Sequence, residues 1–138
     1  MSNSATPKLK QFAGRLLAHE LECSKPADAK DSAAFHVCQK LRPSLSKFMG
    51  AAGFHALLAR ALVLAGAEVS WLRALQIKAD GSIDGLDELE AKFKAKVVAE
   101  GEVFLVAHLV GLLITFIGVD LTLRLLREIW PEMKGLEF

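Results

Sequence analysis

The sequence predicts a mainly α-helical fold, a helical bundle of four to five helices with a small β-hairpin at about residues 75–84. Apolar residues make up 52% of the chain, and in most segments they recur at the three- and four-residue spacing of one helix face. The stretch 103–119 contains no charged side chain, and Asp80-Gly81 is a strong hairpin-turn signal. With 138 residues the chain is long enough for one core, so we expect a single domain over residues 1–138.

Residues 6–42 are expected to form two amphipathic helices after a loose tail at residues 1–5. Thr6 supplies a capping hydroxyl, and Pro7 suits the first helical position. The second helix is expected to stop before Pro43, because proline lacks an N–H and disfavours helix in the residue before it. The inward-facing residues of the two helices are predicted to be Leu9, Phe12, Ala13, Leu16, Leu17, Ala34, Val37, Cys38 and Leu41.

Residues 44–68 are expected to form a third helix that is rich in small side chains. Its large apolar residues share one face, which we expect to be buried: Phe54, Leu57, Leu58 and Leu62. The opposite face is mostly small, through Ala52, Gly53, Ala56 and Ala59. Small faces allow two helix backbones to approach closely, in membranes and in soluble bundles alike.

The hairpin or loop region at residues 69–85 precedes C-terminal helices over residues 86–130. Leu86, Leu89, Phe93 and Val97 fall on one face of a short helix with charged residues on its other side. We expect Glu100-Gly101-Glu102 to kink or break this helix before a final long helix from residue 103 to about Trp130.

The uncharged stretch 103–119 requires cover on nearly every side, because it lacks the charged face of an ordinary surface helix. From the short length of the chain we expect this cover to come from other copies of the protein, a partner or lipid. Small or mildly polar residues recur on one side of the stretch, at His108, Gly111, Thr115 and Gly118. The interaction residues predicted along this helix are Gly111, Leu112, Ile114, Thr115 and Gly118.

We expect a non-enzymatic protein–protein interaction module, an oligomerising adaptor or accessory subunit that binds itself or a protein partner. The alternative is a small membrane-inserted helical hairpin, since a hydrocarbon core needs about 17–25 apolar residues and 103–119 reaches the lower bound. A third interpretation is a small-molecule binder that uses an interhelical pocket. Two cysteines and no N-terminal secretory pattern favour a cytoplasmic protein, and the membrane alternative would place it at the inner or plasma membrane.

Composition argues against nucleic acid as a partner, because the net charge is only +1 and the chain has no Tyr. No nucleotide-binding loop, nucleophile elbow or active-site carboxylate pair is present in the sequence, so no catalytic residues and no cofactor are expected. One candidate for a small polar site remains. His55 and His108 both lie in apolar helices and could form a shared polar pocket.

Metal binding is not expected, although two sequence patterns partly resemble metal sites. Asp80-Gly-Ser82-Ile-Asp84-Gly85 matches the start of a calcium loop, but Ala91 stands where such a loop needs its closing Glu. The second pattern is a group of zinc-ligand types whose spacing places only the first two on one helix face: His19, Cys23, His36 and Cys38.

Overall fold

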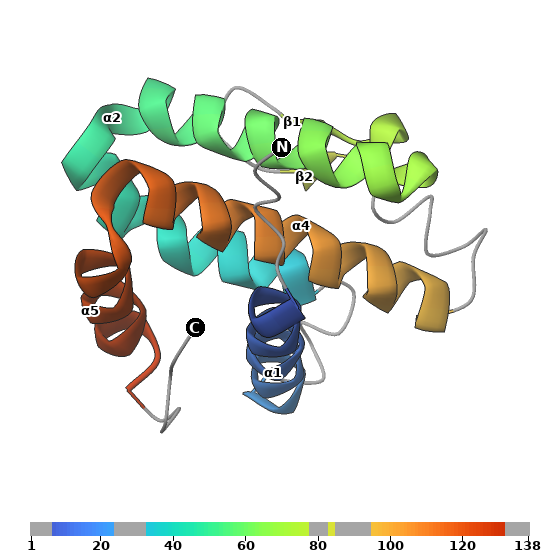
Figure 1. The fold of residues 1–138 in the computed structure, drawn as a ribbon, viewed down its shortest axis with the longest axis horizontal. Coiled ribbons are helices and arrows are strands. Elements are labelled where there is room, and N and C mark those ends of the chain that lie inside the picture. Colours follow the sequence, from blue (N-terminus) through green and yellow to red (C-terminus); the bar gives the residue numbers. More distant parts are fainter. Residues whose placement is uncertain (1–6, 24–32, 78–82, 85–94, 132–138) are drawn as a thin grey trace.

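The chain folds as a helical bundle with one small hairpin, as its sequence predicts (Figure 1). The computed structural model describes residues 7–23, 33–77, 83–84 and 95–131. The elements are α1 (Pro7–Cys23), α2 (Ala33–Glu68), the 3₁₀ helix η2 (Ser70–Ala74), β1 (Gln76–Ile77), β2 (Ile83–Asp84), α4 (Ala95–Ile117) and α5 (Val119–Ile129).

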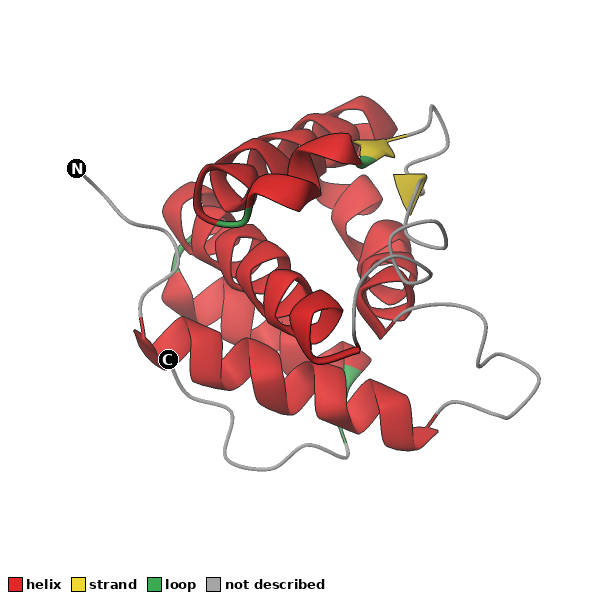
Figure 2. Ribbon diagram, turned by 90° about the vertical axis from the view of Figure 1, so that its right-hand side faces the viewer, coloured by secondary structure: helices red, strands yellow, loops and turns green. Residues whose placement is uncertain are grey.

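The hairpin predicted around residues 75–84 is present and short. Strands β1 and β2 pair antiparallel, with Gln76 opposite Asp84 and Ile77 opposite Ile83. Figure 2 shows the two strands at the edge of the helical body. The Asp80-Gly81 turn and the helix expected at residues 86–94 lie outside the described residues.

Helix α1 begins at Pro7, where the sequence predicts a helix start. Its five predicted inward residues, Leu9, Phe12, Ala13, Leu16 and Leu17, are all buried. The exposed side includes Lys8, Gln11 and Arg15. The helical spacing of apolar residues therefore identified the buried face of α1 correctly.

The prediction that a helix ends before Pro43 is wrong. Helix α2 continues through Pro43, and its kink lies at Gly50, where φ is 77° and ψ is 165°. A proline inside a helix loses one hydrogen bond, but buried Leu41 and Leu45 on either side of Pro43 pack into the core and offset that loss. The backbone conformation of Gly50 is essentially restricted to glycine, so the helix breaks there.

The kink divides α2 into a first half (33–49) and a second half (51–68) that run in opposite directions (Figure 1). The side chains predicted to face inward from the second half, Phe54, Leu57, Leu58 and Leu62, are buried. On the opposite side Ala52 and Ala56 are exposed. The two halves of α2 thus pack as two separate helices of the bundle.

The expected single helix from residue 103 to Trp130 is also wrong, and so is the break expected at residues 100–102. Helix α4 passes through residue 101 without interruption and ends at Ile117. Gly118, with φ 88° and ψ 162°, separates it from α5. The amide of Gly118 still donates to the Ile114 carbonyl at 2.9 Å, and the Gly118 carbonyl accepts from the amide of Thr122 at 3.1 Å.

Most of the uncharged stretch in α4 is covered by this chain alone. Every residue from 105 to 113 is buried, and α4 contacts α1, α2 and α5. The expectation that cover must come from other molecules or lipid is therefore wrong for residues 105–113. The expectation failed because it was based only on the short length of the chain, whereas α1, α2 and α5 all contact α4.

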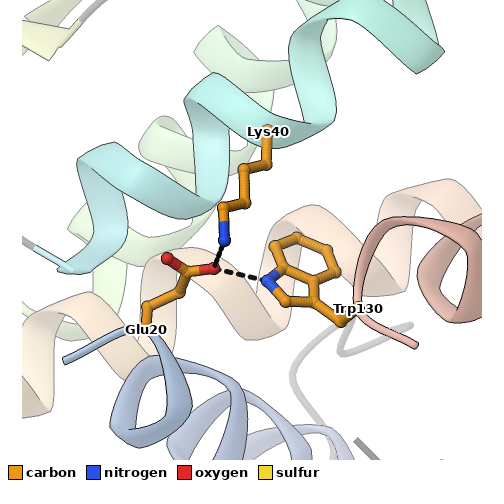
Figure 3. Close-up of polar contacts among 3 residues, drawn as sticks. All are labelled: Glu20, Lys40 and Trp130. Atoms are coloured by element: carbon orange, nitrogen blue, oxygen red, sulfur yellow. Dashed lines mark hydrogen bonds and ion pairs between the residues drawn. The ribbon is translucent and has the colours of Figure 1, made fainter. Parts of the chain in front are cut away.

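A polar cluster, buried except for Lys40, joins three distant parts of the chain (Figure 3). The carboxylate of Glu20 in α1 accepts a hydrogen bond from the indole N–H of Trp130, the residue after α5. Lys40 in α2 places its Nζ 2.6 Å from the same Glu20 oxygen. Glu20 and Trp130 are both buried, so the carboxylate fixes α1 against α2 and the end of α5 from inside the fold.

Candidate functional site

An apolar groove lies at the end of the bundle where α2 turns back and α4 meets α5, on the left of Figure 1. Its volume is about 410 Å³. Residues of α2 line it on one side, namely Phe48, Met49, Gly53, Ala56, Leu57 and Arg60, and α4 contributes Phe116 and Ile117. We refer to it below as the apolar groove.

Two phenylalanine side chains at the apolar groove are largely exposed to solvent. Phe48 is 53% exposed and Phe116 is 67% exposed, and Val119 at the start of α5 is 45% exposed. Fully burying a side chain of this size contributes roughly 1.5–3 kcal/mol. The chain therefore leaves substantial apolar surface uncovered at one end, although it covers the middle of α4 completely.

Arg60 is the one charged residue among the described residues that line the apolar groove. It is exposed and forms no salt bridge or hydrogen bond with another described residue. The rest of the solvent-facing side of the second half of α2, up to Glu68, consists of Ala51, Ala52, Ala56, Val63 and Ala67. Before Glu68, this exposed side is thus apolar apart from the guanidinium of Arg60.

The predicted interaction residues of α4 lie at different depths. Gly111 and Leu112 are buried inside the chain, Ile114 is half-buried, and Thr115 and Gly118 are exposed. The hydroxyl of Thr115 donates to the Gly111 carbonyl at 3.1 Å, within the same helix. A partner could therefore reach only the last part of this set, beside the apolar groove, and the role predicted for these residues stays a prediction.

His108 and His55 do not bond to each other in the described part of the chain. His108 is buried, and its Nε2 lies 3.4 Å from a carboxylate oxygen of Glu68 at the end of α2. Its Nδ1 has no hydrogen-bond partner among the described residues. His55 is half-buried. The shared polar pocket of these two histidines stays a prediction.

The buried thiol of Cys38 has a strongly raised pKa. Burial, and to a smaller extent the negative charge of nearby Glu102, raises the pKa of the Cys38 thiol to about 12. A thiolate is the nucleophilic and metal-binding form of cysteine. Cys38 is therefore held in its unreactive protonated form and acts as a small core side chain, as the sequence predicts.

The two metal patterns in the sequence gain no support from the described residues, which contain no group of three or more His, Cys, Asp or Glu side chains suited to a metal. Most of the calcium-like segment at 80–85, and the side chain of Cys23, lie outside the described residues.

A second hollow of about 410 Å³ lies on α5 and differs from the apolar groove in its chemistry. It is lined by Asp120, Leu123, Arg124, Arg127 and Glu128. Its charges have both signs and come from a single helix, which is typical of a solvated helix surface. It does not indicate a particular ligand.

Two segments, His36–Glu68 and Val97–Ile117, are long and apolar enough to cross a membrane, and a core helix of a soluble protein can also have these properties. In α4, 61% of the most apolar window is buried within the chain, against 33% in α2. Burial explains the apolar character of α4 as that of a core helix. It does not explain α2, whose uncovered side borders the apolar groove.

No protein-family description, curated protein or solved structure matches this chain significantly.

The apolar groove was not predicted from the sequence, although one signal for it was present. The same pattern, Phe followed by an apolar residue and Gly, occurs as Phe48-Met49-Gly50 and as Phe116-Ile117-Gly118. Both glycines end a helical segment with a positive φ, and the two residues before each of them line the apolar groove. An aromatic residue just before a helix-ending glycine lies in the last turn of the helix. Fewer neighbouring side chains are available there to cover its ring.

Proposed function

We propose that this protein is a non-enzymatic helical interaction module that receives apolar side chains of a protein partner in the apolar groove. The observation that carries the proposal is the exposure of Phe48 and Phe116 on either side of that groove. Aromatic side chains next to a pocket are the residues that contribute most to protein interfaces.

The exposed side of the second half of α2 supports the same function. Arg60 is its only charged residue before Glu68, and the alanines around it allow close approach of another helix. A partner helix placed along this side would cover the apolar groove and the alanine surface together. Arginine at the edge of such a contact is common, because its stem packs on apolar atoms while its guanidinium binds a carboxylate.

The two described side chains best suited to chemistry, the Cys38 thiol and the His108 imidazole, do not favour catalysis. The Cys38 thiol is protonated at neutral pH, since its pKa is raised to about 12 by burial and by the Glu102 carboxylate. His108 is buried against Glu68 in the bundle, whereas the lining of the apolar groove is non-titratable except for Arg60. A general acid or base needs contact with a substrate, and neither Cys38 nor His108 lines the apolar groove.

A second candidate function is membrane association, which the apolar character of α2 favours. Its second half would be about 27 Å long at 1.5 Å per residue, close to the roughly 30 Å of a hydrocarbon core. In that case the partner at Phe48 and Phe116 would be lipid.

Site-specific photo-cross-linking in cells tests the proposal. A photoreactive amino acid is placed at Phe116 and, as a matched control, at Val97, an exposed apolar residue at the opposite end of the same helix. We expect protein adducts of defined mass at position 116 and none at position 97. The adducts should disappear when Ala56→Trp fills the apolar groove and persist with Ala67→Trp, which alters an exposed alanine of α2 outside the groove.

Three results would contradict the proposal: no protein adduct at position 116, equal adducts at positions 116 and 97, or adducts that survive Ala56→Trp. Adducts with lipid alone would overturn it in favour of the membrane alternative. Thermal unfolding of both tryptophan variants checks that each has kept its fold.

A further inference from the structure

We infer that the partner in the apolar groove is a second copy of this chain, docked about a two-fold axis. This inference rests on the proposed function and names its partner. In a two-fold contact each copy uses the same surface, so that surface needs both a receptor and the group that fills it. The end of the bundle with the two glycine kinks carries both.

The receptor and the inserting side chains lie next to each other on one molecule. The apolar groove is the receptor, and Phe116, which forms part of its wall, is 67% exposed. Val119 follows three residues later, after the Gly118 turn, and is 45% exposed. When two such ends face each other, the exposed ring of Phe116 and the side chain of Val119 from one copy lie against the groove of the other, and the reverse contact forms at the same time.

Charge complementarity supports a second copy over an unrelated apolar partner. Arg60 lines the groove, and Asp120 follows Val119 directly on the inserting side. Both residues are exposed, and neither forms a salt bridge or hydrogen bond with another described residue. In a two-fold contact Arg60 of each copy would meet Asp120 of the other, which gives two symmetric ion pairs at the rim of an apolar centre.

The same carboxylate argues against a membrane surface as the occupant. Lipid docking is favoured where apolar side chains are rimmed by basic residues, because cytoplasmic leaflets are negatively charged. Here Asp120 directly follows one of the exposed apolar side chains, Val119, so an anionic surface would repel this carboxylate. A protein surface that presents a guanidinium, as this chain does at Arg60, would instead attract the Asp120 carboxylate.

A charge-swap series measured by sedimentation or light scattering tests the inference on the full chain. We expect the wild-type protein to reach twice the chain mass of 15.0 kDa at micromolar concentration. Arg60→Asp and Asp120→Arg each place like charges opposite each other and should weaken the dimer about tenfold or more. The double variant restores the pairs with reversed polarity, and its dissociation constant should return to within about threefold of wild type.

Two controls isolate the interface from the stability of the monomer. Lys8→Asp reverses an exposed charge on α1, away from the groove, and should leave the mass unchanged. Asp120→Arg also removes a favourable carboxylate from the first turn of α5, and that loss persists in the double variant. Recovery of the dimer without recovery of the melting temperature would therefore come from the contact between copies.

A wild-type protein that stays monomeric at all concentrations overturns the second copy as partner, as does a dimer that neither single variant weakens. If the double variant fails to recover, the Arg60–Asp120 pairing is wrong. These failures differ from failure of the proposed function, because a monomer that still gives groove-dependent adducts at position 116 with another protein would keep the interaction function and lose only this partner.

Discussion

Gly50 and Gly118 have nearly the same backbone conformation, with φ of 77° and 88° and ψ of 165° and 162°. Each ends a helical segment, and each follows a Phe and a second apolar residue that line the apolar groove. These torsion angles are open to glycine and strained for residues with a Cβ. The two glycines therefore form the end of the bundle at which the apolar groove lies.

Replacing either glycine by alanine is expected to destabilise the fold by about 1–3 kcal/mol through backbone strain. Apart from the adjacent backbone, no heavy atom of the described residues lies within 4 Å of the Cβ position at Gly50 or Gly118, so steric overlap should not contribute. Gly14 is the matched control, because it lies inside α1 with similarly open space, and Gly14→Ala should stabilise by about 0.5–1 kcal/mol. Urea unfolding measures all three, and equal effects at positions 14, 50 and 118 would contradict the strain explanation.

Gly101→Ala is expected to destabilise the protein by about 1–3 kcal/mol through overpacking. A Cβ at this position in α4 would lie 2.6 Å from Cη2 of Trp71 and closer still to its Cζ2. The rigid indole must then move as a whole. In a Trp71→Leu background the overlap is removed, and Gly101→Ala should become neutral or stabilising, because alanine favours helix over glycine. A penalty that is unchanged in that background would mean that another contact causes it.

Glu20→Ala is expected to lower the free energy of unfolding by about 1–3 kcal/mol, because it leaves the buried indole N–H of Trp130 without its acceptor. Glu20→Gln should cost less, since its amide oxygen can still accept from Trp130 while the attraction to Lys40 is lost. In a double-mutant cycle, Glu20→Ala should cost less in a Trp130→Phe protein, which has no indole donor. Additive effects would show that the hydrogen bond contributes little.

Cys38 is expected to resist alkylation in the folded protein at pH 8. Its pKa is raised from 9.0 to about 12 by burial and by the charge of Glu102, so almost no thiolate is present and the side chain is enclosed. A Cys23→Ser background ensures that only Cys38 is measured. Modification should be fast in denaturant and slow without it, and rapid labelling of the native protein would contradict the burial.

The raised pKa of Cys38 is expected to lower the stability of the fold at high pH. Below pH 9.0 the thiol is protonated in both states, so the raised pKa has no effect. Between about pH 9 and 12 the unfolded chain loses the proton while the folded one keeps it, which favours unfolding. Wild type should therefore lose more stability than Cys38→Ala when urea unfolding is compared at pH 8 and pH 10.

Several features were determined by the sequence itself. Helical spacing identified the buried faces of α1 and of the second half of α2, Pro7 marked a helix start, and the small hairpin occurs where Asp80-Gly81 predicted it. These predictions succeeded because each depends on residues within a few positions of one another. The candidate site was not predicted, although Phe48-Met49-Gly50 and Phe116-Ile117-Gly118 provided a local signal.

Tertiary structure decided where the helices break and what remains uncovered. Pro43 was expected to end a helix and Gly101 to break one, yet α2 and α4 pass through both positions, and the breaks occur at Gly50 and Gly118. Local propensity is worth a few kcal/mol at most, and the packing of Leu41 and Leu45 around Pro43 outweighs it. Cover for α4 likewise depends on where α2 turns back, which is a relationship between distant segments. The sequence by itself therefore specified which helix faces are apolar, and only the folded chain determined that residues 105–113 are enclosed while Phe48 and Phe116 remain exposed.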